Sequence, residues 1–146
     1  MKRDEQVELL KAAQRAAANS YSPYSRFPVG AALRFRGGAV HTGANVENAS
    51  YPVGMCAERA ALFAAVGQGE RELVAVAVFA EKDPLIVPCG ACRQALAEFA
   101  HPPREAEVLL GSPDRFRVLS LEDLLPHAFT LPKPPEGRKA KASRGR

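Results

Sequence analysis

The chain has 146 residues and a mass of 15.7 kDa, a length that fits one domain with its own core. Hydrophobic residues make up 47% and charged residues 25% of the sequence, and the mean hydropathy is −0.17, which excludes a collagen-like, low-complexity or wholly disordered chain. The formal charge of +4 resides at one end, because residues 133–146 carry a net +5 and the other 132 residues a net −1. We expect a domain over residues 1–131 with no specific nucleic-acid partner, then a basic, proline-containing disordered tail over residues 132–146, for which loose RNA contact is the alternative.

The N-terminal third of the chain predicts a helix followed by a hairpin. Helical periodicity runs from about residue 4 to residue 18. Its stripe on one face is formed by Val7, Leu10, Gln14 and Ala17. Residues 30–35 and 39–46 then predict two short strands around Gly37-Gly38, whose glycines suit a two-residue hairpin turn.

The middle of the chain predicts a polar loop, a helix and a buried strand. The loop covers residues 45–55, and an alanine-rich helix follows from Cys56 to Val66. The continuous apolar run Leu73–Ala80 is typical of a strand covered on both faces. Eight residues cannot cross a membrane, which takes about 20 in a helix, and residues 1–6 turn acidic where a signal peptide would turn apolar. We therefore expect no membrane partner and a cytoplasmic location.

The C-terminal third completes the predicted architecture. A helix over residues 90–100 ends at His101-Pro102-Pro103, strands follow over residues 107–111 and 116–119, and a helical turn covers residues 121–125. This alternation of helices and strands predicts an α/β fold with right-handed βαβ crossovers. We expect a three-layer α-β-α sandwich around a mixed sheet of about five strands.

Three cysteines are the most informative residues of the chain. Their odd number in a cytosolic setting argues for a metal or catalytic site rather than a disulfide framework. The sequence C-A-E at 56–58 opens one predicted helix, and P-C-G-A-C at 88–92 opens the next. Positions Cys89 and Cys92 share one side of a helix, whereas Cys56 and Glu58 would point about 200° apart, so they can serve one centre only if Cys56 precedes the first turn. Helix N-termini favour thiolates, and zinc suits three sulfur ligands with one position open for water.

The cysteines and Glu58 are also compatible with simpler roles. A bare C-x-x-C also occurs in redox pairs and in closed structural zinc sites. Structural zinc sites usually have four protein ligands, yet the chain has no fourth cysteine, and His41, His101 and His127 lack the spacing of ligands. Glu58 alone would be a first-turn carboxylate that favours the helix dipole.

Four motifs together are more specific: F-P-V-G-A-A-L at 27–33, N-V-E-N-A-S-Y-P at 45–52, C-A-E-R at 56–59 and P-C-G-A-C-R-Q at 88–94. Zinc deaminases carry H-x-E followed by P-C-x-x-C, with a three-cysteine variant, and Cys56 stands at the place of the histidine. Over about residues 5–130 the sequence resembles the small, homotetrameric cytidine deaminases that act on free nucleosides, with the motifs in the family's order and spacing. The resemblance implies the cytidine deaminase-like fold and one zinc ion per subunit.

The resemblance also implies roles for the residues around the metal. Cys56, Cys89 and Cys92 would be the zinc ligands, with water as the fourth. Glu58 would take a proton from that water and deliver protons to the pyrimidine nitrogen and then to the leaving ammonia. Arg59 would hydrogen-bond the cysteine sulfurs and offset the net charge of −1 that three thiolates leave on a dication.

The implied substrate contacts are Phe27, Asn45, Glu47, Ala49, Tyr51, Ala57 and Phe129. Asn45 and Glu47 would hold the 3′-hydroxyl of the sugar, and Phe27 would pack on the pyrimidine, whose polar edge backbone groups at Ala57 and Cys89 would read. Tyr51 and Phe129 would reach a neighbouring subunit's pocket in a homotetramer with shared active sites. Without the resemblance, Phe27 would be a core residue, and Asn45 and Glu47 would be ordinary hairpin-end residues.

The expected function is the zinc-dependent hydrolytic deamination of cytidine and deoxycytidine to uridine and deoxyuridine with release of ammonia, a reaction of pyrimidine salvage. The expected partner is a free pyrimidine nucleoside. One alternative is a deaminase of another cytosine nucleoside, such as a nucleoside antibiotic. A non-catalytic zinc-binding module is the alternative from a different class, and polynucleotide editing ranks lower because the domain is near neutral.

Overall fold

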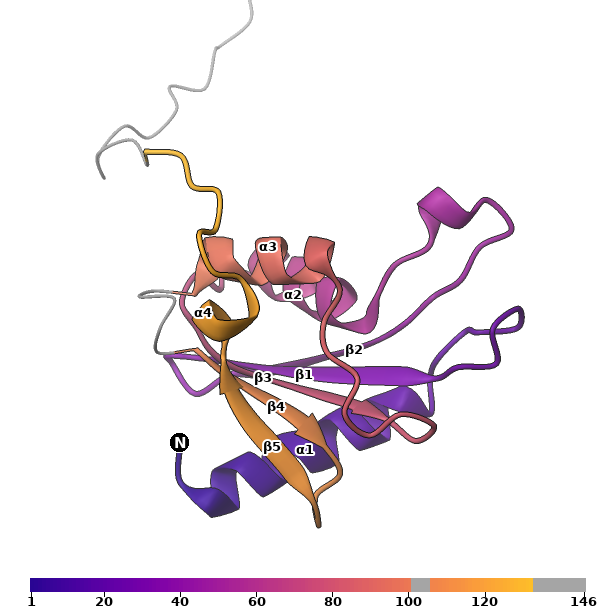
Figure 1. Cartoon of the computed structure of the whole chain (residues 1–146), viewed down its shortest axis with the longest axis horizontal. Helices are drawn as coiled ribbons and strands as arrows, with labels where there is room; N and C mark the ends of the chain where they lie inside the picture. Colours follow the sequence, from indigo (N-terminus) through magenta and orange to yellow (C-terminus); the bar gives the residue numbers. More distant parts are fainter. Residues whose placement is uncertain (101–105, 133–146) are drawn as a thin grey trace, which may run out of the picture.

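The computed structural model describes residues 1–100 and 106–132 of the chain (Figure 1). In chain order its elements are α1 (Arg3–Ala17), β1 (Val29–Phe35), β2 (Val40–Ala44), the 3-10 turn η1 (Tyr51–Val53), α2 (Ala57–Gly67), β3 (Leu73–Ala80), α3 (Gly90–Phe99), β4 (Glu107–Gly111), β5 (Phe116–Ser120) and α4 (Leu121–Leu124). The five strands form one sheet in the order β2-β1-β3-β4-β5. Of these pairs, β3 and β4 are parallel and the other neighbours are antiparallel, so the sheet is mixed, as predicted.

Helices cover both faces of the sheet (Figure 1). On one face α1 packs through Leu10 and Ala13 against alternate strand residues such as Ala77. On the other face α2 and α3 pack through Leu62 and Leu96 against the intervening positions. Successive side chains of a strand point to opposite faces, so one apolar run in β3 serves both cores. The predicted three-layer α-β-α sandwich is confirmed.

Two local predictions are wrong in detail. On α1, Leu10 and Ala17 are buried as predicted, but Gln14 is exposed and Val7 only half-buried, and the rest of the buried face is formed by Leu9, Ala13 and Ala16. Alanine contributes little to a hydrophobicity pattern, so a buried face made largely of alanine is hard to recognise in the sequence. The hairpin turn has three residues between Phe35 and Ala39, not two. The Gly38 N–H donates to the Phe35 carbonyl and closes a β-turn, and within this turn only Gly38 takes a positive φ, of 90°.

Some predictions concern residues that the structure does not describe. The predicted tail lies outside the described residues apart from Pro132, and so do the prolines expected to end the helix over residues 90–100. Within residues 1–100 and 106–132, no helix has the length and apolar character needed to cross a bilayer.

The crossovers place two helix N-termini at one edge of the sheet. Strands β2 and β3 both run antiparallel to β1, so they run in the same direction and their C-terminal ends lie at the same edge. Each strand is followed by a helix that returns over the sheet, α2 after β2 and α3 after β3. Ligand sites of open α/β sheets form at this kind of edge, outside the carboxyl ends of the strands.

We expect Gly43→Ala to lower the free energy of unfolding by about 1–3 kcal/mol, because a Cβ would overpack a backbone contact. That atom would lie 2.6 Å from both the Ala57 carbonyl oxygen and the Ala61 nitrogen, in the first turns of α2. Chemical denaturation measures the change. Gly37→Ala is the matched control, since a Cβ there meets nothing within 4 Å. Equal midpoints for the two variants would contradict the close packing of β2 on α2.

Candidate active site

Three cysteine sulfurs meet where α2 and α3 begin. Cys56 is the N-cap residue of α2 and Cys89 that of α3, both with extended backbone angles, so each sulfur precedes its helix, as the spacing of Cys56 and Glu58 requires. Cys92 lies in the first turn of α3 and is buried. The Sγ atoms of Cys56 and Cys89 are 3.9 Å apart, and all three lie within 4.8 Å of one another. We call these residues the cysteine cluster.

The cysteine cluster has the dimensions of a zinc site. With Zn–S bonds of about 2.3 Å and tetrahedral angles, two ligating sulfurs lie about 3.8 Å apart, close to the separation of Cys56 and Cys89. Neither His41 nor His127 joins the cluster, and no second group of His, Cys, Asp or Glu side chains with such spacing exists within the described part of the chain. Three sulfur donors therefore fit a metal with one position left open.

The thiols of the cluster differ in acidity. A hydrogen bond from Cys92, with further hydrogen bonds from Arg59 and Cys89, lowers the pKa of Cys56 to about 5. The same contact with Cys56, together with burial, raises the pKa of Cys92. Thiolate thus forms at one sulfur while a neighbouring sulfur keeps its proton. A bound dication would displace such protons, since metal ligation requires the deprotonated form.

Arg59 supplies positive charge beside the cluster. Its Nη2 donates to the Cys56 Sγ over 3.7 Å, and its Nε is buried without a hydrogen-bond acceptor among the described residues. Three thiolates around a dication would carry a net charge of −1, which the guanidinium offsets. Arg59 therefore matches a metal-loaded cluster better than an empty one.

We expect Arg59→Ala to lower kcat by about 10- to 100-fold, the usual effect of removing a partner of metal ligands, while zinc content falls less. The reason is that the guanidinium balances charge around the ligands without binding the metal. Turnover and metal content are measured on the same preparation. Arg71→Ala, which removes an exposed arginine bonded to the Val66 and Glu70 carbonyls, is the control. Parallel losses of zinc and turnover would show that Arg59 acts only on structure.

Glu58 is the buried carboxylate of the site. Its exposed fraction is 4%, and among the described residues it is the one charged side chain in the core. Burial, with the negative charge of Cys56 adding to it, raises the pKa of Glu58. Its side chain lines a cavity of about 160 Å³ together with Cys56 and Cys89. A carboxylate of raised pKa in a cavity beside metal ligands is suited to proton transfer.

A second, larger cavity adjoins the first. It measures about 540 Å³ and shares Asn45 and Cys56 with the smaller one. One wall is the arm, residues 45–55, which projects from the body between β2 and α2 (Figure 1). The arm contributes Glu47 and Tyr51 to the lining, and Arg59 of α2 lines the cavity as well. The pair of cavities thus extends from Glu58 to the base of the arm.

Asn45 and Glu47 organise the wall of these cavities. The Asn45 Oδ1 accepts from the Val29 N–H at 2.9 Å, and its Nδ2 donates to the Phe27 carbonyl at 3.0 Å, which leaves one amide hydrogen without an acceptor in the described residues. Glu47 accepts from the backbone N–H groups of Tyr24 and Ser25. Hydrogen bonds led by that of the Ser25 side chain lower the pKa of Glu47, so this carboxylate stays ionised. The wall offers a donor and an anionic acceptor.

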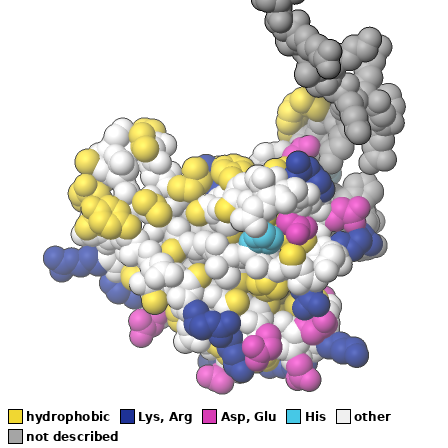
Figure 2. Space-filling view, turned by 180° about the vertical axis from the view of Figure 1, so that it is seen from behind, with side chains coloured by type: hydrophobic (Ala, Val, Ile, Leu, Met, Phe, Trp, Pro, Cys, Tyr) yellow, Lys and Arg dark blue, Asp and Glu magenta, His cyan; other side chains and the backbone are white. Residues whose placement is uncertain are grey.

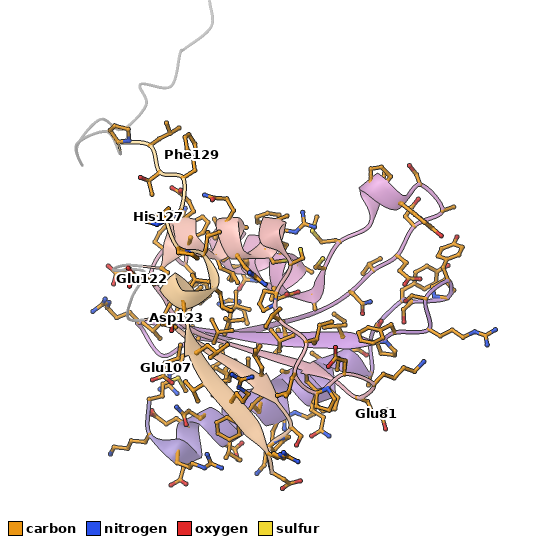
Figure 3. All side chains as sticks on the ribbon, in the orientation of Figure 1. Glu81, Glu107, Glu122, Asp123, His127 and Phe129 are labelled. Atoms are coloured by element: carbon orange, nitrogen blue, oxygen red, sulfur yellow. The ribbon has the colours of Figure 1, made fainter. Side chains whose placement is uncertain are left out.

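Of the remaining residues predicted to contact substrate, some line the two cavities and others do not. Tyr51 lines the larger cavity and Ala57 the smaller. Phe27 lines neither, although its carbonyl is held by Asn45. Ala49 is exposed on the arm. Phe129 lies beyond His127 on the segment that leaves the body, 69% exposed and outside both cavities of its own chain (Figure 3).

Two cavity residues were missed by sequence reasoning. Tyr24 and Ser25 line the larger cavity, and the Tyr24 ring meets Tyr51 edge-on with centroids 6.3 Å apart. The S-P-Y-S turn at 22–25 marks a loop, but nothing local connects that loop to Glu47, which lies 22 residues or more away. Only the folded chain brings these residues together.

Comparisons with known proteins agree with this geometry. The family model for the cytidine and deoxycytidylate deaminase zinc-binding region matches residues 3–104. A cytidine deaminase of Halalkalibacterium halodurans is 48% identical over 123 residues, which cover 84% of this chain and 92% of that protein. One of Mycobacterium tuberculosis is 44% identical over 127 residues, 87% of this chain and 91% of that protein. The crystal structure of a cytidine deaminase from Burkholderia pseudomallei superposes with a TM-score of 0.77 at 48% identity, over 84% of this chain and 97% of that one.

Proposed function

The chain belongs to the cytidine and deoxycytidylate deaminase family, and from this premise we propose that it converts cytidine and deoxycytidine to uridine and deoxyuridine with release of ammonia. One observation carries the proposal: a buried glutamate and two residues of a three-cysteine cluster line the same small cavity. The enzyme is a zinc-dependent hydrolase, and its reaction belongs to pyrimidine salvage.

The cysteine cluster would hold the metal. Cys56, Cys89 and Cys92 supply three sulfur ligands, and zinc bound there would polarise the attacking water. The N-termini of α2 and α3 add positive potential at the cluster, and the Arg59 guanidinium, which donates to the Cys56 Sγ, favours the thiolate form of Cys56.

Glu58 moves the protons of the reaction. Its carboxylate takes a proton from the attacking water and gives it to N3 of the pyrimidine, and a second transfer protonates the amino group that leaves as ammonia. Burial supports this role, because a raised pKa brings a carboxyl closer to the operating pH than an exposed glutamate. The enclosed position also keeps bulk water from competing for these protons.

The two cavities suit the two halves of a nucleoside. The smaller has apolar walls from Val29, Val78 and Ile86 and suits a flat ring, whose polar edge faces backbone groups at Ala57 and Cys89. The sugar then lies in the larger cavity, where Asn45 donates to its 3′-hydroxyl and the Glu47 carboxylate accepts from it. Phe27 and Ala49 complete the proposed substrate contacts.

A homotetramer with shared active sites accounts for the exposed apolar side chains. Tyr51 is 76% exposed on the arm, and Phe63 and Phe129 are exposed elsewhere. Figure 2 shows hydrophobic side chains gathered on the projecting arm, whereas charged groups lie mainly over the opposite part of the body. Exposed apolar patches mark interaction sites in soluble proteins. A sizing measurement tests the assembly, and an active monomer would contradict the shared pocket of Tyr51 and Phe129.

The test of function is an absorbance assay on zinc-loaded protein with cytidine, deoxycytidine, deoxycytidylate and single-stranded DNA. We expect both nucleosides to be deaminated, whereas the near-neutral domain gives the phosphate-bearing substrates no electrostatic advantage. If none of these is deaminated but another cytosine nucleoside, such as a nucleoside antibiotic, is deaminated when added to the assay, the alternative deaminase is favoured. If zinc-loaded protein released ammonia from none of these compounds, the remaining hypothesis would be a non-catalytic zinc-binding module. We also propose a cytoplasmic location, where cysteines stay reduced and available as metal ligands.

A further inference from the structure

Two consecutive side chains of α3 hold the C-terminal part of the chain. Arg93 Nη1 donates to the Leu124 carbonyl at 2.9 Å, and Gln94 Nε2 donates to the Phe129 carbonyl at 2.9 Å. Both side chains are half-buried. We call residues 126–132 the C-terminal segment. Within the described part of the chain, the Gln94 bond is the hydrogen bond that ties this segment to the body.

Arg93 also holds the loop that leads into the cysteine cluster. Its Nε donates to the Pro88 carbonyl at 2.6 Å, directly before Cys89. One guanidinium thus joins the loop that carries a metal ligand to the last residue of α4. Because the guanidinium is a rigid planar fork, it sets the two carbonyls in a defined relation. The loop before Cys89 and the end of α4, from which the C-terminal segment continues, therefore form one hydrogen-bonded unit.

The C-terminal segment is ordered although its own chain buries little of it. Phe129 is 69% and Leu131 71% exposed. His127 adopts a positive φ of 60°, a conformation unusual for a residue other than glycine, where the segment turns away from α4 (Figure 3). Ordering a segment costs conformational entropy, and the exposed Phe129 side chain buries too little surface in its own chain to offset that cost. Because Gln94 anchors the Phe129 carbonyl while the Phe129 ring stays exposed, the ring is held ready for contact with another molecule.

We propose that Gln94 and Arg93 are positioning residues that act in trans: Gln94 holds the C-terminal segment and Arg93 holds the end of α4 just before it, so that Phe129 stands at a set place in the neighbouring subunit's pocket. The partner is a second copy of this chain. This inference rests on the proposed shared-site tetramer and adds the residues that set the shared contact. Arg93 also holds the loop before Cys89. Within one subunit, the neighbouring side chains Arg93 and Gln94 therefore support both its own metal site and the Phe129 contact that it makes with the next subunit.

The first test replaces the Gln94 donor. Gln94→Met keeps the length of the side chain and removes its N–H, so we expect KM for cytidine to rise about fivefold, the usual effect of one lost hydrogen bond, with kcat within about twofold. Zinc content and tetramer mass should stay unchanged, and amide exchange over residues 126–132 should become faster. Gln94→Lys restores a donor and should bring KM back toward the wild-type value. Gln14→Met, at an exposed position of α1, is the matched control.

The second test separates action in trans from action in cis. Gln94→Met subunits are mixed with an excess of Glu58→Gln subunits, so that the working sites belong to the former and their neighbours carry an intact Gln94. Recovery of the wild-type KM in the mixed tetramers supports the proposal. An unchanged KM in pure Gln94→Met, or a raised KM that persists in the mixture, overturns it. An active wild-type monomer would instead refute the shared-site tetramer itself, which sizing shows independently.

Arg93→Lys tests the bridge to the loop before Cys89. One ammonium group cannot replace a guanidinium fork between two carbonyls, so we expect both a raised KM and weaker zinc retention under a chelator. The Gln94 variants should retain zinc like the wild type under the same chelator. Arg93→Lys with wild-type KM and zinc retention would contradict the role of Arg93.

Discussion

Glu58→Gln should lower kcat for cytidine by about 10³-fold or more, because an amide can neither take a proton from water nor deliver one to the pyrimidine. Glutamine keeps the shape of the side chain, and Glu58 is not among the proposed metal ligands, so zinc content should remain that of the wild type. An absorbance assay with metal measured on the same sample tests both statements. Wild-type turnover in zinc-loaded Glu58→Gln would remove the mechanism.

The same substitution should not weaken the fold. Burial raises the pKa of Glu58, so this carboxyl binds its proton more tightly in the folded chain than in the unfolded chain. The free energy of unfolding therefore falls as pH rises from 4.5, the ordinary pKa of glutamate, through the higher pKa of the folded state. Glutamine removes this dependence, and we expect an unfolding temperature at pH 7 equal to or above that of the wild type at matched zinc content. Glu8→Gln, at an exposed glutamate of α1, controls for the change of charge. A destabilised Glu58→Gln would mean that the lost activity reports on folding.

Cys89→Ser should abolish stable zinc binding and lower kcat by about a thousandfold, since the metal contributes several kcal/mol to the transition state. Cys89 is exposed and caps α3, a position where serine is among the preferred residues, so the helix should form as before. We therefore expect the zinc content, measured by atomic absorption, and the turnover to fall, while the far-UV circular dichroism spectrum stays unchanged.

Reconstitution supplies the control for this variant. Wild-type enzyme stripped of metal by a chelator should regain activity when zinc is added back, and Cys89→Ser should not. His41→Ala is a further control. Histidine is a common zinc ligand, but His41 lies outside the cysteine cluster, beside Phe35 and Glu70, so this variant should keep wild-type zinc content. Full zinc binding by Cys89→Ser would exclude Cys89 as a ligand.

The sequence alone predicted the layers and strand number of the fold, because the continuous apolar run of β3 and the order of helices and strands are local signals. It was wrong in two places, one where a tertiary contact overrode the pattern and one where the local turn type differed. Gln14 lies on the solvent side of α1, since the sheet accepts a face of small alanines. The hairpin needs one positive φ, at Gly38, and so takes a turn of three residues.

At the site, the spacing of Cys56, Glu58, Cys89 and Cys92 by itself determined which residues could form one centre and that Cys56 had to precede its helix, because the geometry of a helix N-terminus depends on a few neighbouring residues. The tertiary structure decided what surrounds that centre. The burial of Glu58, the bond from Glu47 to the turn at Tyr24 and Ser25, and the anchoring of Phe129 by Gln94 each join residues or layers that are distant in sequence. Such contacts follow from how α2, α3 and the arm pack, and no local pattern encodes that packing.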